Sequence, residues 1–201
     1  MKIVFFGDSV TEAQRNLNDP ADLGVGFVKI AASELRALYP KPELEILNRG
    51  VGGDKTAELL RRIERDVLAE NPDLVVLDVG VNDVWHRANG VIVTPEEFRA
   101  NYETLVTKIL GAGARLILVQ PFMLRVGDMP GFRPYLNAVN DIIYEIAKRE
   151  HLTLIPMDEI FNDITQDVAP TRFAADGVHP SDIGCQYISD LVVKEIKKHL
   201  K

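Results

Sequence analysis

Five short apolar runs, separated by stretches with helical periodicity, constrain the fold of this 201-residue chain more than any other feature. The runs are rich in leucine and β-branched residues, and residues typical of turns bound each of them. They cover Lys2–Phe6, Leu44–Leu47, Leu74–Val79, Arg115–Val119 and Leu152–Ile155. Because the runs are almost continuously apolar rather than alternating, they predict strands of a parallel sheet that is covered on both faces.

Amphipathic patterns fill the intervals between these runs. Apolar residues recur at helical spacing over Thr56–Glu70 and Arg133–Glu150, and a helix is expected to begin at Pro95 and to run toward Leu110. A last helix is predicted from about Ser181 to His199. Strand and helix thus alternate, which predicts an α/β fold: a doubly wound, flavodoxin-like, five-stranded parallel sheet with helices on both faces. The length suits a single domain over residues 1–201.

The composition argues against several classes of function. A formal net charge of −7 does not suit a nucleic-acid binder, which needs clustered Lys and Arg. No stretch approaches the roughly 20 apolar residues that cross a bilayer, and the run that ends at Gly7 is too short for a signal peptide. The single cysteine, Cys185, agrees with a reducing compartment and suits core packing better than nucleophilic attack. We therefore expect a cytoplasmic protein that binds neither nucleic acid nor membrane.

Residues that follow the predicted strands are the candidates for function, because ligands of doubly wound folds bind at the carboxyl ends of the strands. Gly7-Asp8-Ser9 follows the first strand. A serine at this turn can simply cap the next helix, and the G-x-S-x-G motif of α/β-hydrolases is absent. Taken alone, Ser9 is therefore better explained as a helix cap than as a nucleophile.

A glycine-rich loop follows the second strand, with Gly50, Gly52 and Gly53 ahead of a predicted helix. Such a loop leaves backbone N–H groups free to bind a phosphate or an oxyanion. The phosphate alternative is weaker, because Asp54 interrupts the pattern of a P-loop and its carboxylate would repel phosphate.

Two further segments carry polar side chains, one after the third predicted strand and one in a turn before the last predicted helix. Gly80-Val81-Asn82-Asp83 is typical either of an Asx turn or of an amide that donates into a site. Of the four histidines, His179 has a carboxylate, Asp176, three residues upstream. In a turn, that spacing lets Asp176 hold one ring nitrogen while the other faces a substrate. Asp78, within the third apolar run, is explained only by a structural hydrogen bond or a pairing partner.

Together these four segments resemble the signature of the SGNH, or GDSL-type, hydrolase family, in the same order and over nearly the whole chain. Val10 stands where the family name has leucine. The resemblance implies a serine esterase with Ser9 as nucleophile, His179 as general base and Asp176 as the residue that orients it. It also implies an oxyanion hole made by the backbone N–H groups of Ser9 and Gly53 and the side-chain amide of Asn82.

Segments at Gly24–Val28, Asn82–Trp85 and Gln120–Met123 are similar to intracellular acetylxylan esterases of this family, which deacetylate xylo-oligosaccharides. The likeness implies short-chain carboxylic esters as substrates, in particular O-acetyl groups on carbohydrate, cleaved through an acyl-enzyme without cofactor or metal. A thioesterase or lysophospholipase with the same machinery is the first alternative. A noncatalytic α/β binding module for a small molecule is the second.

Three more residues are candidates for substrate binding: Asp8, Trp85 and Phe122. Trp85 can stack on a sugar ring or pack locally. Phe122 belongs to an apolar loop after the fourth strand that is expected to bury beneath itself, or else to line an acyl pocket or the interface of a possible homo-oligomer.

Overall fold

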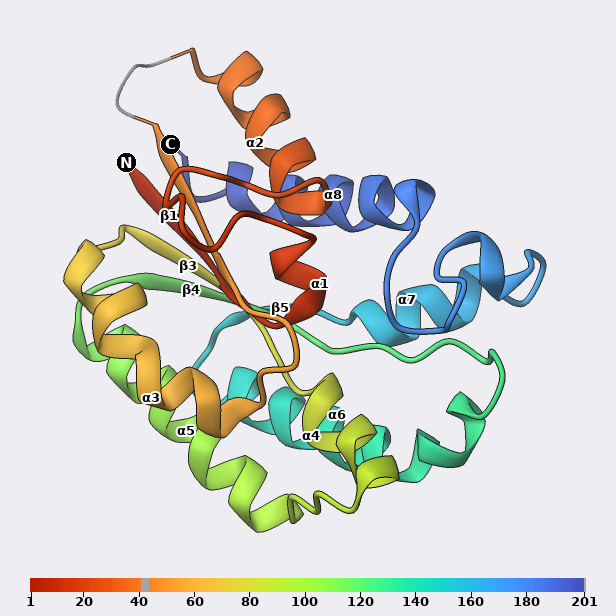
Figure 1. The fold of residues 1–201 in the computed structure, drawn as a ribbon. Coiled ribbons are helices and arrows are strands. Elements are labelled where there is room, and N and C mark those ends of the chain that lie inside the picture. Colours follow the sequence, from red (N-terminus) through yellow and green to blue (C-terminus); the bar gives the residue numbers. More distant parts are fainter. Residues whose placement is uncertain (41–43, 201) are drawn as a thin grey trace.

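A five-stranded parallel sheet forms the centre of the computed structural model, which describes residues 1–40 and 44–200 (Figure 1). The strands are β1 (Lys2–Gly7), β2 (Glu45–Gly50), β3 (Leu74–Asp78), β4 (Arg115–Val119) and β5 (Thr153–Ile155). They lie in the order β2-β1-β3-β4-β5, and every neighbouring pair is parallel. The predicted doubly wound parallel sheet is therefore confirmed.

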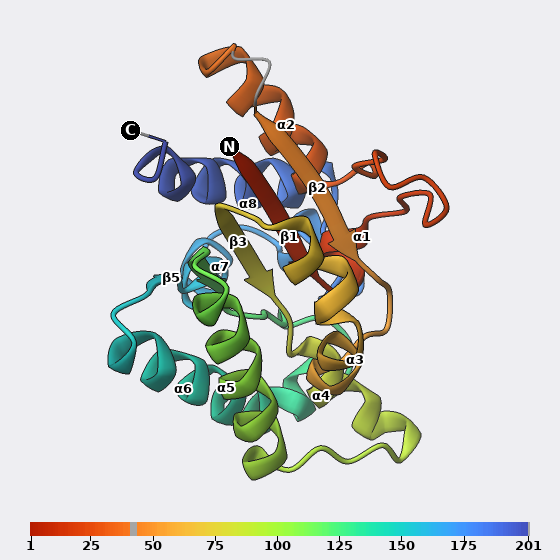
Figure 2. The same ribbon diagram turned by 90° about the vertical axis from the view of Figure 1, so that its left-hand side faces the viewer.

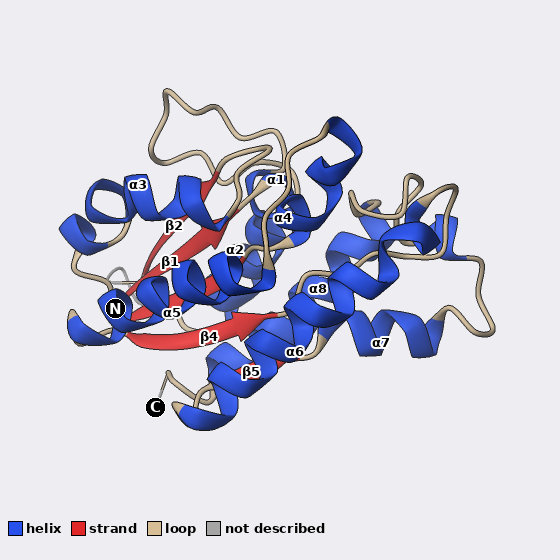
Figure 3. Ribbon diagram, turned by 90° about the horizontal axis from the view of Figure 1, so that it is seen from below, coloured by secondary structure: helices blue, strands red, loops and turns tan. Residues whose placement is uncertain are grey.

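Helices cover both faces of this sheet (Figure 3). The eight α-helices in the described residues are α1 (Ser9–Glu12), α2 (Phe27–Leu38), α3 (Thr56–Asp66), α4 (Val81–Trp85), α5 (Pro95–Gly111), α6 (Arg133–Arg149), α7 (Met157–Ile164) and α8 (Asp182–Lys197). Helices α3, α5 and α6 pack on one face, and α2, α7 and α8 pack on the other. Short 3₁₀ turns follow α3 (η1, Leu68–Glu70) and α4 (η2, His86–Asn89) and precede α6 (η3, Met129–Phe132) and α8 (η4, Pro170–Arg172).

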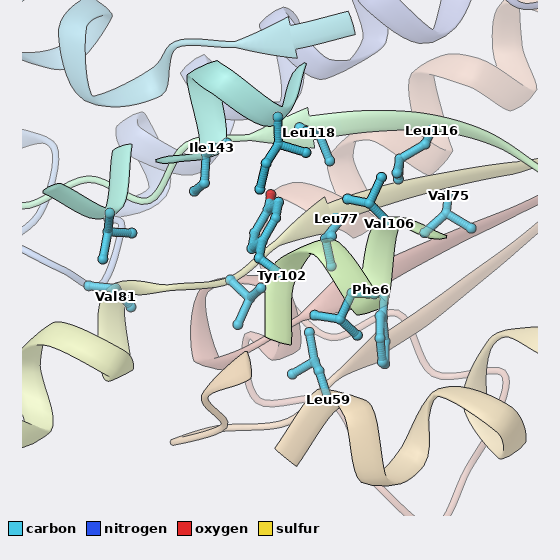
Figure 4. Packing of buried hydrophobic residues seen from close by; sticks show 14 of the residues in the cluster. Phe6, Leu59, Val75, Leu77, Val81, Tyr102, Val106, Leu116, Leu118 and Ile143 are labelled. Carbon is cyan, nitrogen blue, oxygen red and sulfur yellow. The ribbon is translucent and has the colours of Figure 1, made fainter. Parts of the chain in front are cut away.

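The packing of the first face shows why the strands have almost no polar positions. Phe6 and Leu77 come from adjacent strands and lie fully buried against Tyr102 of α5 and Leu59 of α3 (Figure 4). The alternate residues of the same strands, such as Phe5, face the second layer. Each such side chain contributes about 1.5–3 kcal/mol through burial, so both faces of the sheet must be apolar.

Local sequence sets the helix ends close to where the patterns predict them. Thr94 and Glu97 form a reciprocal capping box ahead of Pro95 at the start of α5. The side chain of Ser181 accepts a hydrogen bond from the Gly184 N–H at the start of α8. The helix predicted over Thr56–Glu70 ends earlier, at Asp66, and the chain continues into η1.

The second strand differs most from its prediction. It runs to Gly50 rather than ending at Leu47, because Asn48 and Arg49 stay buried in the strand. The Asn48 amide donates hydrogen bonds to the backbone carbonyls of Thr11 and Leu23, at 2.7 and 2.9 Å. Polar side chains with such partners can occupy a buried strand end, and they also tie β2 to the segment that follows β1.

Candidate active site

Four residues singled out by the sequence meet around one pocket at the carboxyl end of the sheet. Ser9 follows β1, Gly53 follows β2 and Asn82 follows β3, while His179 comes from the turn before α8. The pocket has a volume of about 430 Å³, and these four residues line it together with Trp85, His86, Ala88 and Asn89.

The start of α1 decides between the two explanations of Ser9. The N-cap residue is Asp8, whose carboxylate accepts a hydrogen bond from the Val10 N–H at 3.0 Å. The Ser9 hydroxyl is therefore free of capping, and its Oγ lies 3.0 Å from Nε2 of His179. Gly7 allows this tight turn, since a Cβ there would collide with the Asp78 carbonyl and the Thr11 hydroxyl.

Asp176 holds the imidazole of His179 in place. Its Oδ2 lies 2.6 Å from Nδ1 of His179, and its Oδ1 accepts from the backbone N–H groups of Val178 and His179 at 2.9 and 2.8 Å. Partial burial acts to raise the pKa of Asp176, but these hydrogen bonds outweigh it and the pKa is lowered. An ionised carboxylate on Nδ1 leaves Nε2 to accept the proton of Ser9.

Two polar side chains of α4 form hydrogen bonds with the glycine loop and with the first residue of α3. The amide of Asn82 donates to the backbone carbonyl of Asp54 at 3.0 Å, which leaves its second N–H for another acceptor. Asp83 accepts from the backbone N–H and the hydroxyl of Thr56, at 3.1 and 2.7 Å. Within the described residues, the N–H of Gly53 has no acceptor. The pocket wall thus offers hydrogen-bond donors in fixed positions close to Ser9.

Burial corrects two of the expected substrate contacts. Asp8 is 1% exposed and is engaged as the cap of α1. Phe122 is 5% exposed and packs against Phe161 of α7, with ring centroids 4.6 Å apart. Phe122, in the loop after β4, is therefore buried against α7. Neither Asp8 nor Phe122 is accessible to a substrate.

Trp85 does line the pocket. Its ring centroid lies 5.6 Å from that of His179, and the two planes are inclined by 53°. Both rings therefore belong to the wall of the same pocket.

Sequence reasoning left out two residues of the pocket wall, His86 and Asn89, which both belong to η2. His86 stands over the glycine loop, since a Cβ built on Gly53 would lie 4.0 Å from its Cε1 atom. Burial, followed by the positive charge of Lys55, lowers the pKa of His86, which favours the neutral ring. Its position four residues after Asn82, one helical turn on, was the available signal.

Three further features bear on other kinds of chemistry. In residues 1–40 and 44–200, no group of three or more His, Cys, Asp or Glu side chains could hold a metal ion. The same part of the chain contains no helix that is both long and apolar enough to cross a membrane. Cys185 is buried, and burial raises the pKa of its thiol, which favours the unreactive protonated form.

Comparison with known proteins agrees with this geometry. A model of the GDSL-like lipase/acylhydrolase family matches residues 5–187. An acetylxylan esterase of Geobacillus stearothermophilus is 27% identical over 97% of this chain and 93% of its own length. An arylesterase of Vibrio mimicus is 27% identical over 79% of this chain and 72% of its own.

Solved structures give the same result. The crystal structure of Axe2, the acetylxylan esterase of Geobacillus stearothermophilus, matches with a TM-score of 0.89 at 27% identity, over 97% of this chain and 93% of that one. LAE5, an alpha/beta hydrolase from the metagenome of Lake Arreo, matches with the same TM-score and identity over 96% and 93%. Because the family model spans nearly the whole fold and every segment that lines the pocket, this chain belongs to the GDSL-like lipase/acylhydrolase family and is an ester hydrolase.

Proposed function

We propose that this esterase removes O-acetyl and similarly short acyl groups from carbohydrates such as acetylated xylo-oligosaccharides, through an acyl-enzyme on Ser9. The observation that carries the proposal is the hydrogen-bonded chain from Ser9 through His179 to Asp176, with contacts of 3.0 and 2.6 Å. A serine hydroxyl becomes a nucleophile at neutral pH when a positioned base accepts its proton during attack.

Acylation begins when Nε2 of His179 takes the proton of Ser9 as Oγ attacks the ester carbonyl carbon. The carboxylate of Asp176 stabilises the imidazolium that forms. As the tetrahedral intermediate collapses, the bond to the alcohol oxygen breaks and His179 returns its proton to that oxygen. The free alcohol leaves, and the acyl group stays on Ser9 as an ester.

The negative oxygen of the intermediate needs donors that are already in place. We assign this role to the backbone N–H groups of Ser9 and Gly53 and to the free N–H of Asn82. The Ser9 N–H lies in the first turn of α1, where backbone donors have no partner within the helix. Asn82 is held by the Asp54 carbonyl and needs no reorientation during the reaction.

Deacylation repeats these steps with water as the nucleophile. His179 takes a proton from the water as the water oxygen attacks the acyl carbon. As the bond between the acyl carbon and Oγ of Ser9 breaks, His179 transfers that proton to Oγ. The products are a carboxylic acid and the regenerated enzyme.

The shape and polarity of the pocket favour a small acyl group and a polar alcohol. Its volume is about 430 Å³, and His86 and Asn89 contribute polar atoms to a wall that Trp85 completes. An aromatic ring flanked by hydrogen-bonding side chains suits a sugar ring with its hydroxyl groups. The name of the acetylxylan esterase relative supports an acetyl group on a carbohydrate, and that of the arylesterase relative supports an ester substrate in general.

The experiment that tests the mechanism combines labelling with substitution. A fluorophosphonate should label Ser9 and inhibit the enzyme, and Ser9→Ala should lower kcat for p-nitrophenyl acetate by about 10⁴-fold or more. Near-normal turnover by folded Ser9→Ala protein would refute the assignment. Lack of labelling together with lack of activity in the unaltered protein would favour a binding module.

The substrate is tested by comparing kcat/KM for acetyl, butyryl and octanoyl p-nitrophenyl esters, acetylated xylose and an acyl thioester. We expect acetyl esters to be cleaved fastest and acetylated xylose to release acetate. A preference for octanoyl esters or for the thioester would instead point to a lysophospholipase or thioesterase.

A further inference from the structure

A second cavity, which we call the arginine groove, lies beside the glycine loop but shares no lining residue with the pocket of Ser9. Its volume is about 710 Å³, and Val51 and Asp54 of the glycine loop form part of its wall. Figure 2 shows β2 with α1 and α3 close to its carboxyl end, which is where the groove lies. Five arginines from these elements and the adjoining segments line it: Arg15, Arg49, Arg61, Arg62 and Arg65.

Two of the buried arginines use both of their terminal amino groups within the protein. Arg62 donates to the carboxylates of Asp54 and Asp66 at 2.7 and 3.0 Å, and also to the backbone carbonyls of Arg49 and Gly7. Arg49 in turn donates to the carboxylate of Glu70 at 3.0 Å and to the backbone carbonyls of Pro20 and Asn48. These two guanidinium groups serve the fold.

Arg15 is different, although it is equally buried, with 9% of its surface exposed. Its Nε donates to the Gly50 carbonyl at 2.9 Å, which fixes the plane of the guanidinium. Within residues 1–40 and 44–200, neither of its terminal amino groups has a hydrogen-bond or ion-pair partner. Both belong to a side chain that lines the groove, so a fork of unpartnered donors is open to a ligand there.

The carboxylates that line the groove form their ion pairs with cations other than Arg15. Asp54 and Asp66 bind Arg62, Glu58 binds Lys55 and Arg61, and Glu70 binds Arg49 and Lys2. Glu12 lies close enough to act on Arg15 electrostatically, but its carboxylate accepts from the Gly52 N–H.

The pKa of Arg15 reflects these surroundings. Burial, followed by the positive charges of Arg49 and Arg62, lowers the pKa of Arg15, while the charges of Glu12 and Asp66 act in the opposite direction. Three guanidinium groups therefore lie together in a protein whose formal net charge is −7, and one of them has donors to spare.

We propose that the arginine groove binds a small oxyanion, a phosphate or carboxylate group, held by the two terminal amino groups of Arg15. A guanidinium presents two parallel N–H groups whose spacing matches two oxygens of either anion. Because Nε is already anchored to Gly50, binding orders no further part of this side chain. The proposal does not depend on the esterase function, since it concerns a different cavity.

The test measures the binding of inorganic phosphate and of glucuronate by titration calorimetry, and the Tm of the protein with each anion by scanning calorimetry. Chloride keeps the ionic strength constant in both experiments. Both anions should raise the Tm of the unaltered protein in a saturable way, because a ligand that binds the folded state stabilises it. Tighter binding of phosphate would identify a phosphate ligand, and tighter binding of glucuronate would identify a carboxylate-bearing sugar.

The variants Arg15→Gln and Arg15→Lys separate the fork from the charge. Arg15→Gln should weaken binding of the preferred anion at least tenfold, and Arg15→Lys, which keeps the charge but loses the fork, should also weaken it. Arg36→Gln removes a charge from the exposed side of α2 and should bind like the unaltered protein. Equal binding by folded Arg15→Gln, or no saturable binding by the unaltered protein, would overturn the proposal.

A measurement on the unaltered protein guards against variants that fail to fold. The side-chain nitrogen resonances of Arg15 should shift on titration with phosphate and saturate at the concentration that calorimetry gives. Unchanged Arg15 resonances, with shifts confined to exposed arginines, would contradict the proposed site.

Discussion

At the first turn of α1, Asp8 accepts the hydrogen bond from the Val10 N–H that a helix N-terminus requires, and the Ser9 hydroxyl is left for His179. Aspartate and serine are both good capping residues, so their order in the chain cannot tell which of them caps. The distinction rests on backbone geometry, because only the residue just before the helix turns its side chain toward the first N–H groups. One residue thus takes the structural role and its neighbour is free for chemistry.

The contribution of Asn82 can be measured by deletion. Asn82→Ala should lower kcat for p-nitrophenyl acetate by roughly 10²–10³-fold with little change in KM, because one donor to the transition-state oxygen is lost. Asn137→Ala, on the exposed side of α6, is the matched control and should keep full activity. A variant of Asn82 with a raised KM and an unchanged kcat would exclude the oxyanion role.

Sequence patterns predicted the residues of the proposed catalytic machinery better than they predicted the other residues that line the pocket. Ser9, Gly53, Asn82 and His179 were expected because each stands at a strand end or a marked turn. For Phe122 the sequence left burial and an acyl pocket both open, and the contact with Phe161 of α7, which no local pattern encodes, decides for burial. His86 had a single signal in the sequence, its position one helical turn after Asn82, and η2 then brings it over Gly53.

Among the elements, α4 links the sheet to the pocket, and its five residues include Asn82, Asp83 and Trp85. It begins after Gly80, whose φ of +137° is open to glycine and rarely to other residues. Hydropathy gives little warning of such short elements. Hydropathy also fails to predict that β2 extends past its apolar run. Asn48 and Arg49 can be buried in this strand because they have hydrogen-bond partners, which a hydropathy pattern does not take into account.

The entry to α4 can be tested by adding a methyl group. In Gly80→Ala the Cβ would lie 3.1–3.3 Å from Pro121, Val139 and Phe98, in addition to the backbone strain. We expect the free energy of unfolding to fall by about 1–3 kcal/mol and the activity to fall with it, as Asn82 is displaced. Urea denaturation and a p-nitrophenyl acetate assay measure the two effects.

Gly90→Ala separates the effect of backbone strain from the effect of steric contact with neighbouring side chains. Gly90 has a φ of +79°, but a Cβ there would meet nothing within 4 Å. Its loss of stability should be about 1 kcal/mol, smaller than that of Gly80→Ala, with activity kept. Equal losses in the two variants would mean that packing around Gly80 is not tight.

Considered as a whole, the molecule keeps several carboxyl groups away from water at the carboxyl edge of its sheet. Burial raises the pKa of Asp78 to about 7 and that of Asp83 to about 6. Burial, followed by the charge of Asp78, also raises the pKa of Asp8. The Asp8 and Asp78 pair therefore retains a proton into the neutral range, and ionising it opposes folding.

This pair gives the stability a definite pH dependence. The folded protein keeps a proton on Asp78 up to about pH 7, whereas the unfolded chain releases it near pH 4. The unfolded state binds fewer protons in that window, so this contribution to stability falls as the pH rises from about 4 to 7. Its destabilising effect is fully present above pH 7 and absent below about pH 4.

Asp78→Asn imitates the protonated form and should be more stable than the unaltered protein above pH 7, by an amount on the order of a few kcal/mol. The difference should shrink as the pH is lowered toward 4, as measured by urea denaturation across the range. Asp141→Asn, exposed on α6, serves as the control. A difference that does not vary with pH would show that Asp78 is not the group responsible.

The hydrogen bond between Ser9 and His179 joins positions 170 residues apart, and every strand of the sheet precedes His179 in the chain. Contacts of such long range form late in folding, after the loops between them have closed. With Ser9 and His179 in the roles proposed above, ester cleavage should start only when the last segment has docked against the first. In a refolding experiment, release of nitrophenol would time that final assembly step without any attached dye.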